Sequence, residues 1–149
     1  MQVTYEIGQS IPLIQAAAPR ILLAFLPEEQ RNQILQELDS TPGRSNNGFD
    51  RDFLLQRLEG IKEQGYEVDE EELTPGAFAG AAPVFEHTGS VIASITVTTP
   101  AIRTSHQRRG KLVELIVSAA KEISGQMGHT PSLKQPLRPS PRRLYWQAR

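Results

Sequence analysis

The alternation of hydrophobic and polar residues predicts two β-strands joined by a tight turn in the middle of the chain. A small, apolar segment begins near Ala77 and ends before the turn Glu86-His87-Thr88-Gly89. In the strand that follows, successive side chains point to opposite faces. One face is then apolar and the other carries three hydroxyls: the first set is Val91, Ala93, Ile95 and Val97, and the second is Ile92, Ser94, Thr96 and Thr98.

Apolar positions at helical spacing predict four helices. They are expected at residues 15–26, 27–39, 51–64 and about 109–127. The first helix should begin near Pro19, because proline is tolerated only in a first turn. Asp50 suits the N-cap of the third helix, and Gly65 suits its end. The expected core positions are Ile34, Leu35 and Leu38 in the second helix, Leu54, Leu55, Leu58 and Ile61 in the third, and Leu112, Leu115, Ile116, Ala119, Ala120, Ile123 and Met127 in the fourth.

The alternation of apolar and polar residues also predicts a strand at residues 2–8. Three connecting segments show no periodicity: a polar loop at 39–49, an acidic loop at 66–77 and a basic connection at 101–110. The order is then strand, three helices, two strands and a helix. We expect an antiparallel sheet flanked by helices on one side, which is an α+β fold.

Composition narrows the classes of protein. A chain of 149 residues fits one domain with its own core. The absence of cysteine excludes disulfides, thiolate catalysis and cysteine-ligated zinc. No apolar window approaches the length of a membrane span, about 18 residues, and the first residues lack the layout of a signal peptide. A cytoplasmic location is expected.

The net charge of −1 is unevenly distributed along the chain. Residues 130–149 contain five basic residues and no acidic ones, so the remainder holds 11 basic against 17 acidic residues. An acidic body does not suit a nucleic-acid groove. We expect a folded region at 1–128, a basic, proline-rich tail at 129–149 that is extended or disordered, and no direct contact of this chain with nucleic acid or membrane.

Two groups of polar residues are candidates for chemistry. The first is the acidic run 69–72, which is either a solvated loop or a segment that turns one carboxylate inward to a ligand; Asp69 is the better candidate because it follows the apolar Val68. The second is the hydroxyl face of Ser94, Thr96 and Thr98, which is either a solvent face or the wall of a ligand site.

No set of residues predicts an enzyme, a metal centre or a cofactor site. The three histidines, His87, His106 and His129, are scattered and lack metal-ligand spacing. The sequence contains no phosphate-binding glycine loop and no nucleophile elbow. Arg103, Arg108, Arg109 and Lys111 could meet phosphates, although a solvated helix entry fits them equally well.

The register of the central hairpin is open from the sequence. A three-residue loop would place Gly80 opposite Thr96, and a two-residue loop would place Ala79 there. A slip by one residue reverses which face each side chain occupies. A bulge near Gly89 or Pro83 would also shift the pairing.

The stretch GYEVDEEELTPGAFAGAAPVFEHTGSVIASITVTTP resembles the effector-binding domain of IclR-type bacterial transcription regulators, whose pattern is a GYA-x-D-x-EE loop, Pro-Gly, an AAPV strand, a D-x-x-G turn and an ALSVSGP-like strand. The upstream IPLIQAAAPRILLAFLPEEQ resembles the PLHASALGKALLAFLPPEE segment of the family, and LVELIVSAAKEISGQMG resembles its final helix. The resemblance covers about residues 3–128.

The resemblance implies a GAF-like domain that binds a small organic acid and helps to form dimers or tetramers. It implies ligand-binding positions at Ala17, Ala18, Asp69, Ala77, Ala79, Thr96 and Thr98. Backbone N–H groups near Ala17 and Ala18 would add donors at a helix start. It also implies that Ala79 and Thr96 share the face of the pocket.

The chain departs from the family pattern at several positions. Ala79 stands where a cysteine is usual, Gly80 replaces a β-branched residue, and Pro19-Arg20 replaces Gly-Lys. The winged helix-turn-helix and the front of the effector domain have no counterpart, so an N-terminally truncated relative is expected. The leading hypothesis is a metabolite-binding domain without its own DNA-binding domain. The alternatives are an association module that pairs with itself or with full-length relatives, and a fragment without independent function.

Overall fold

The computed structural model describes residues 7–8, 13–40 and 50–131. Within them the elements are α1 (Ala17–Phe25), α2 (Glu28–Ser40), α3 (Arg51–Gln64), β1 (Glu67–Glu70), β2 (Ala77–Phe85), β3 (Val91–Pro100), the 3-10 helix η1 (Ala101–Arg103) and α4 (His106–Gln126). The α+β class is as predicted. The predicted strand 2–8 lies outside the described residues except for its last two, which form a turn. Most of the polar loop 39–49 and of the tail 129–149 also lies outside them.

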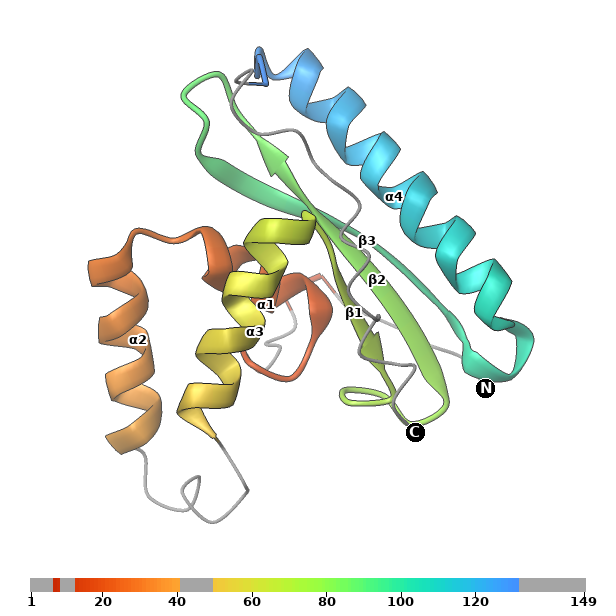
Figure 1. Ribbon diagram of the computed structural model, residues 1–149, viewed down its shortest axis with the longest axis horizontal. Coiled ribbons are helices and arrows are strands. Elements are labelled where there is room, and N and C mark those ends of the chain that lie inside the picture. Colours follow the sequence, from red (N-terminus) through yellow and green to blue (C-terminus); the bar gives the residue numbers. More distant parts are fainter. Residues whose placement is uncertain (1–6, 9–12, 41–49, 132–149) are drawn as a thin grey trace.

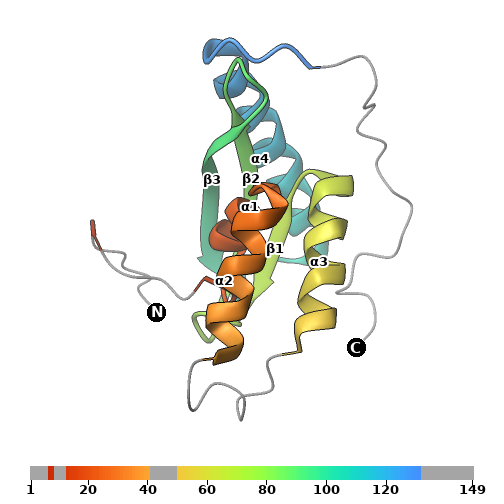
Figure 2. The same cartoon turned by 90° about the vertical axis from the view of Figure 1, so that its left-hand side faces the viewer.

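The three strands form one antiparallel sheet in the order β1-β2-β3. Helix α4 covers one face of the sheet, while α1 and α3 lie on the other and α2 lies farther out (Figure 1). The turned view in Figure 2 places α1 and α4 on opposite sides of β2 and β3. The prediction of helices on one side only was therefore wrong. The cause is β2, whose small side chains are buried on both faces: Ala81 packs with α1, and Ala82 packs with α4.

The predicted start and stop signals of α1 and α3 are confirmed. Pro19 lies in the first turn of α1. The Asp50 side chain accepts a hydrogen bond from the Phe53 N–H at 3.0 Å, which caps α3. Gly65 ends α3 in the left-handed conformation, at φ 77°, and donates its N–H to the Ile61 carbonyl. The buried core on this side of the sheet includes the predicted Leu35, Leu54, Leu58 and Ile61.

The buried face of α4 differs from the predicted one. Ile116 and Ala120 are buried as expected, but the face continues through Ser124, not Ile123. Leu115 is 58% exposed, and Ile123 and Met127 are also exposed. The predicted set therefore combined buried positions with exposed ones, because the face against the sheet includes a serine, which a count of apolar residues leaves out. None of the helices in the described ranges is long and apolar enough to cross a bilayer.

Two segments predicted as loops contain regular structure. The first half of the acidic loop 66–77 is β1, whose inward positions are Glu67 and Asp69, each 4% exposed. Alternation failed there because the buried side chains are the charged ones. The basic connection 101–110 holds η1 and the first turn of α4, where the Ser105 hydroxyl accepts a hydrogen bond from the Arg108 N–H.

The hairpin register combines a three-residue loop with a bulge. Glu86 donates its N–H to the Ser90 carbonyl across the turn, and the pairing shifts by one residue between Val84 and Phe85. Thr96 therefore pairs with Ala81, and Ala79 pairs with Thr98. Both predicted partners of Thr96 were wrong, but Ala79 and Thr96 do share a face. The shift also places Val91 opposite Phe85, on the other face from Ala93, Ile95 and Val97.

Candidate functional site

A small cavity opens on the α1 side of the sheet, where all three strands contribute to one wall. Its volume is about 10 Å³, and it is lined by Asp69 of β1, Leu73 and Thr74 of the following loop, Ala77 and Ala79 of β2, and Thr98 of β3. Asp69 and Thr98 reach it from opposite edges because both pair with Ala79. A space of this size holds about one water molecule.

Asp69 is held in place by the backbone of the loop that follows it. Its Oδ1 accepts the Glu72 N–H at 2.8 Å. Burial raises the pKa of Asp69 above its usual value, against the opposing effects of this hydrogen bond and of Arg20. A carboxyl group that keeps its proton more readily can accept or donate hydrogen bonds. Its inward orientation agrees with the inward interpretation of the acidic run, and its contact with a ligand stays a prediction.

The predicted ligand residues divide into two groups in space. Asp69, Ala77, Ala79 and Thr98 line the cavity, and the Thr98 hydroxyl makes no hydrogen bond with any residue of the described ranges. The remaining three lie outside the lining: Ala17 is buried in the core, Ala18 packs against that core, and Thr96 is exposed. Helix α1 nevertheless starts at Ala17 without a side-chain cap, which leaves the N–H groups of Ala17 and Ala18 as its possible donors, because Pro19 has no N–H and the Arg20 N–H donates to the Ala16 carbonyl.

Sequence reasoning missed a network of four charged side chains beside the cavity. Arg20 is fully buried, and its Nε donates to Glu67 Oε1 at 2.8 Å. Arg57 of α3 donates from its own Nε to the same oxygen at 2.7 Å. Both guanidinium groups also reach Glu72. The sequence contains one indication of this network, the arginine at position 20, which departs from the family pattern. A single residue forms no pattern from which its partners could be predicted.

The rest of the acidic run lies at the surface, with Glu71 and Glu72 exposed and Glu70 half-buried, which agrees with the solvated-loop interpretation, but these carboxylates are also bonded. Glu70 accepts from Arg109 Nη1 at 2.8 Å, and Arg109 lies over the Phe78 ring, 5.1 Å from its centroid. Glu71 has a positive φ of 64°, and its Oε2 accepts the Gly76 N–H at 3.0 Å. The first bond joins β1 to α4, and the second closes the loop 71–76 on itself.

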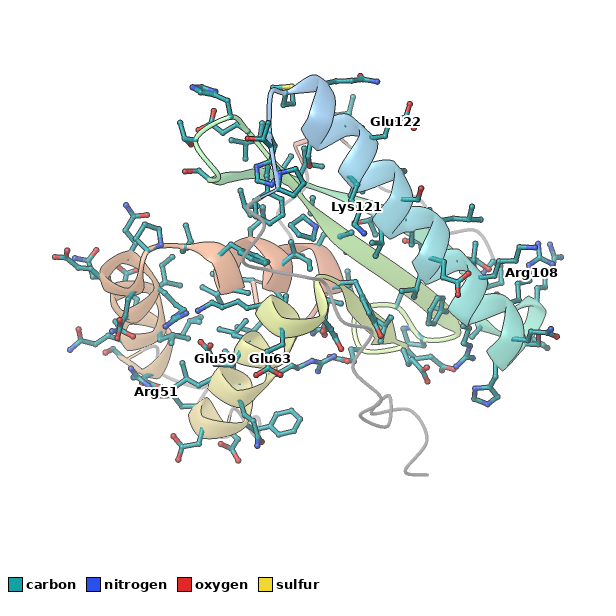
Figure 3. All side chains as sticks on the ribbon, turned by 45° about the horizontal axis from the view of Figure 1, so that its top comes forward. Arg51, Glu59, Glu63, Arg108, Lys121 and Glu122 are labelled. Carbon is teal, nitrogen blue, oxygen red and sulfur yellow. The ribbon has the colours of Figure 1, made fainter. Side chains whose placement is uncertain are left out.

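The other candidate chemistry does not gather into a site. Arg108 projects from the first turns of α4, away from the sheet (Figure 3). His129 stacks on Phe85 with ring centroids 5.0 Å apart, and His87 is exposed. Among the described residues no three acidic or histidine side chains are arranged to hold a metal ion.

Gly80, which replaces a β-branched residue of the family pattern, lies on the face of the sheet opposite to the cavity. A Cβ atom at this position would approach Ile116 Cδ1 of α4 to 2.9 Å. The glycine therefore lets α4 pack closely on β2 and does not shape the cavity.

The comparisons with known proteins all indicate the same family. The family model for the bacterial transcriptional regulator IclR C-terminal domain matches residues 1–125. The chain is 34% identical over 124 residues to the HTH-type transcriptional regulator KdgR of Escherichia coli, which corresponds to 83% of this chain and 47% of that protein. It is 34% identical over 125 residues to the HTH-type transcriptional repressor AllR of Salmonella paratyphi A, or 84% of this chain and 46% of that protein.

Solved structures agree with this match. The C-terminal domain of E. coli KdgR has a TM-score of 0.69 at 34% identity, covering 82% of this chain and 74% of that one. The IclR protein of Thermotoga maritima has a TM-score of 0.73 at 26% identity, covering 85% and 51%. The chain spans about half the length of the curated relatives it matches. Those relatives are transcriptional regulators and not enzymes.

Proposed function

This chain belongs to the IclR C-terminal family of bacterial transcriptional regulators, and from that premise we propose that it binds a small organic acid and associates with other regulator chains. Effector binding is typical of the family. The proposed ligand-binding domain is residues 1–128, with 129–149 as a basic tail. The proposed location is the bacterial cytoplasm, and DNA contact is assigned to parts of a regulator other than this chain.

The convergence of Asp69 and Thr98 on one cavity is the observation that supports this function most strongly. The Thr98 hydroxyl has a free donor for a ligand oxygen, and Asp69 offers an acceptor for a ligand hydroxyl. The alanines between them leave room above β2. Thr74, which also lines the cavity, supplies a second hydroxyl.

The raised pKa of Asp69 suits an acidic ligand. Two carboxylates placed close together repel one another unless they share a proton. Burial already shifts Asp69 toward its protonated form, so the energetic cost of placing a carboxylic acid beside it is reduced. Protonation of Asp69 removes the negative charge that repels an acidic ligand. The affinity for acids should therefore be greater at lower pH.

The cavity must enlarge when a ligand enters, since about 10 Å³ does not hold an organic acid. Leu73 and Thr74 are the lining residues that lie on a loop, whereas the others lie on strands. We assign the enlargement to a displacement of this loop, because the lining strands are joined to one another by ladders of backbone hydrogen bonds and move less readily than a loop.

Calorimetric titration with a panel of small mono- and dicarboxylic acids, with and without hydroxyl groups, tests the proposal. We expect at least one acid to bind, and Asp69→Asn and Thr98→Val each to weaken it by about tenfold, the effect of losing one strong hydrogen bond. Thr88→Val makes the same change of side chain in the exposed turn of the hairpin and is the matched control. A chain that is folded by circular dichroism yet binds none of these acids contradicts the proposal.

A second function, subunit association, is favoured by exposed apolar side chains on β3 and α4. Ile92 is 46% exposed, and Leu115 is 58% exposed. Size-exclusion chromatography of the wild type against Leu115→Lys would show a lower apparent mass for the variant. Equal elution volumes of the two at high concentration would contradict this role for α4.

A further inference from the structure

The loop 71–76 connects the cavity to the arginine pair formed by Arg20 and Arg57. Its residues Leu73 and Thr74 line the cavity. Its residue Glu72 points to the two guanidinium groups, one from α1 and one from α3. In the chain, Glu72 directly precedes the two loop residues that line the cavity.

Glu72 is bound by the two arginines in the way that the carboxylate of a ligand would be. Its Oε2 accepts from Arg20 Nη1 at 2.8 Å and from Arg57 Nη1 at 3.3 Å, and its Oε1 accepts from Arg57 Nη2 at 2.7 Å. Two planar guanidinium groups thus hold both oxygens of one carboxylate. Such bidentate pairing is the strongest carboxylate recognition that proteins use.

The two glutamates of the network differ in how firmly they are fixed. Glu67 lies on β1 with a side chain 5% exposed, and it takes the Nε edge of each arginine. Glu72 lies on a loop with a side chain 35% exposed, and it takes the outer N–H groups. Glu67 is therefore a fixed partner, whereas Glu72 can be replaced from the solvent side.

Charge balance requires some anion in the position of Glu72. With both glutamates in place, the two arginines are neutralised. If Glu72 leaves, one positive charge remains on a pair of which Arg20 is fully buried. An uncompensated buried charge is costly, so a carboxylate from outside would be drawn to the same donors.

We propose that Arg20 and Arg57 form a carboxylate-binding subsite that Glu72 fills from within the chain and that the carboxylate of an acidic ligand takes over. The inference rests on the proposed function for its ligand class and adds where the acid group binds. Displacement of Glu72 releases Leu73 and Thr74, which enlarges the cavity beside Asp69 and Thr98. The ligand class is then a small hydroxy acid, with its carboxylate on the arginines and its hydroxyl at Asp69.

Titration with acetate, and with acetamide as its uncharged counterpart, tests the subsite directly. Glu72→Gln removes the competing carboxylate, so it should bind acetate on the order of tenfold more tightly than the wild type, with acetamide unchanged. Adding Arg57→Gln should abolish this gain while leaving Arg20 paired with Glu67. Glu63→Gln makes the same change of charge at an exposed position on α3 (Figure 3) and should match the wild type.

Glu72→Asp keeps the charge but withdraws it by one methylene, so it should also bind acetate more tightly if Glu72→Gln does not fold. The inference is overturned if folded Glu72 variants bind acetate no better than the wild type, or if acetamide gains as much as acetate. This failure is separate from failure of the proposed function: acids that bind through Thr98 and are insensitive to Glu72 would leave that function intact and refute only the subsite.

Discussion

Replacement of Arg20 by methionine perturbs the buried charge network in the most informative way. Methionine fills much of the aliphatic volume of arginine but has no donor. The change removes hydrogen bonds to Glu67, to Glu72 and to the carbonyl oxygens of Ile14 and Val68. Because Arg20 is fully buried, water does not replace these bonds freely.

The expected cost follows from the partners that remain. Removing one member of a buried ion pair typically costs about 3–5 kcal/mol. Here Arg57 still bonds to Glu67, Glu72 and the Val68 carbonyl, so the loss should lie at the lower end, about 3 kcal/mol. That is a large share of the roughly 5–15 kcal/mol that stabilises a typical domain.

A second replacement tests whether the cost arises from the stranded carboxylate. Glu67→Leu in the Arg20→Met background removes the buried charge that lost its partner and leaves Arg57 paired with Glu72. Replacing a buried pair by apolar residues is often neutral or stabilising. The double variant should therefore recover about 2 kcal/mol relative to Arg20→Met, although Glu67→Leu alone is destabilising.

Urea denaturation of the four proteins in this cycle measures these free energies. With a slope of about 2 kcal/mol per molar, a loss of about 3 kcal/mol lowers the midpoint by roughly 1.5 M. A loss below about 1 kcal/mol for Arg20→Met would show that the ion pairs of Arg20 contribute no more stability than solvated ion pairs at a protein surface. A double variant no more stable than Arg20→Met would refute the assignment of the cost to Glu67.

Three further predictions concern the site and its supporting face. Burial raises the pKa of Asp69, so the folded state binds this proton more tightly, and the stabilisation that this provides is lost as pH rises through the folded pKa. Asp69→Asn should thus gain stability relative to the wild type in urea titrations as the pH rises above about 4, the ordinary pKa of an aspartate, and a difference independent of pH would count against it. Gly80→Val should lower the free energy of unfolding by about 1–3 kcal/mol, because the new side chain overpacks the contact with α4, and the addition of Ile116→Ala should restore part of this loss. A melting temperature of Gly80→Val equal to that of the wild type would refute the close approach. Ser124→Ala removes the hydroxyl that accepts the Phe85 N–H at 3.0 Å, so about 1–2 kcal/mol should be lost and hydrogen exchange at Phe85 should accelerate; unchanged exchange would disprove this bond.

Helices α1 to α3 were predictable because local signals agree with the packing. Pro19, Asp50 and Gly65 act through the backbone of their own segments, and the apolar stripes of α2 and α3 each have one face to bury. No distant contact is needed to place these elements, so sequence reasoning was sufficient for them.

The features that failed depend on partners far apart in the chain. Strand β1 buries Glu67 and Asp69. This burial is stable because Arg20 and Arg57, which lie far away in the sequence, are packed beside the strand and pair with Glu67. The face of α4 depends on the hydroxyl of Ser124, which bonds to the sheet at the bulge.

The hairpin register failed for a related reason. A one-residue shift beyond the turn changes every pair in the ladder while leaving the pattern of the sequence unchanged. The resemblance could still place Ala79 and Thr96 on one face, because the observed pairs Ala79–Thr98 and Ala81–Thr96 differ from an Ala79–Thr96 pair by two residues, and a shift of two residues keeps each side chain on its face.

The central claim is that an organic acid binds where Asp69 and Thr98 meet, under the loop 71–76. A crystal structure of the chain with the tightest-binding acid of the panel tests it most directly. The account predicts density for the acid within hydrogen-bond distance of Thr98, with its carboxylate on Arg20 and Arg57 and Glu72 turned away. Acid bound elsewhere, with the cavity still about 10 Å³ in volume and Glu72 still on both arginines, would contradict it.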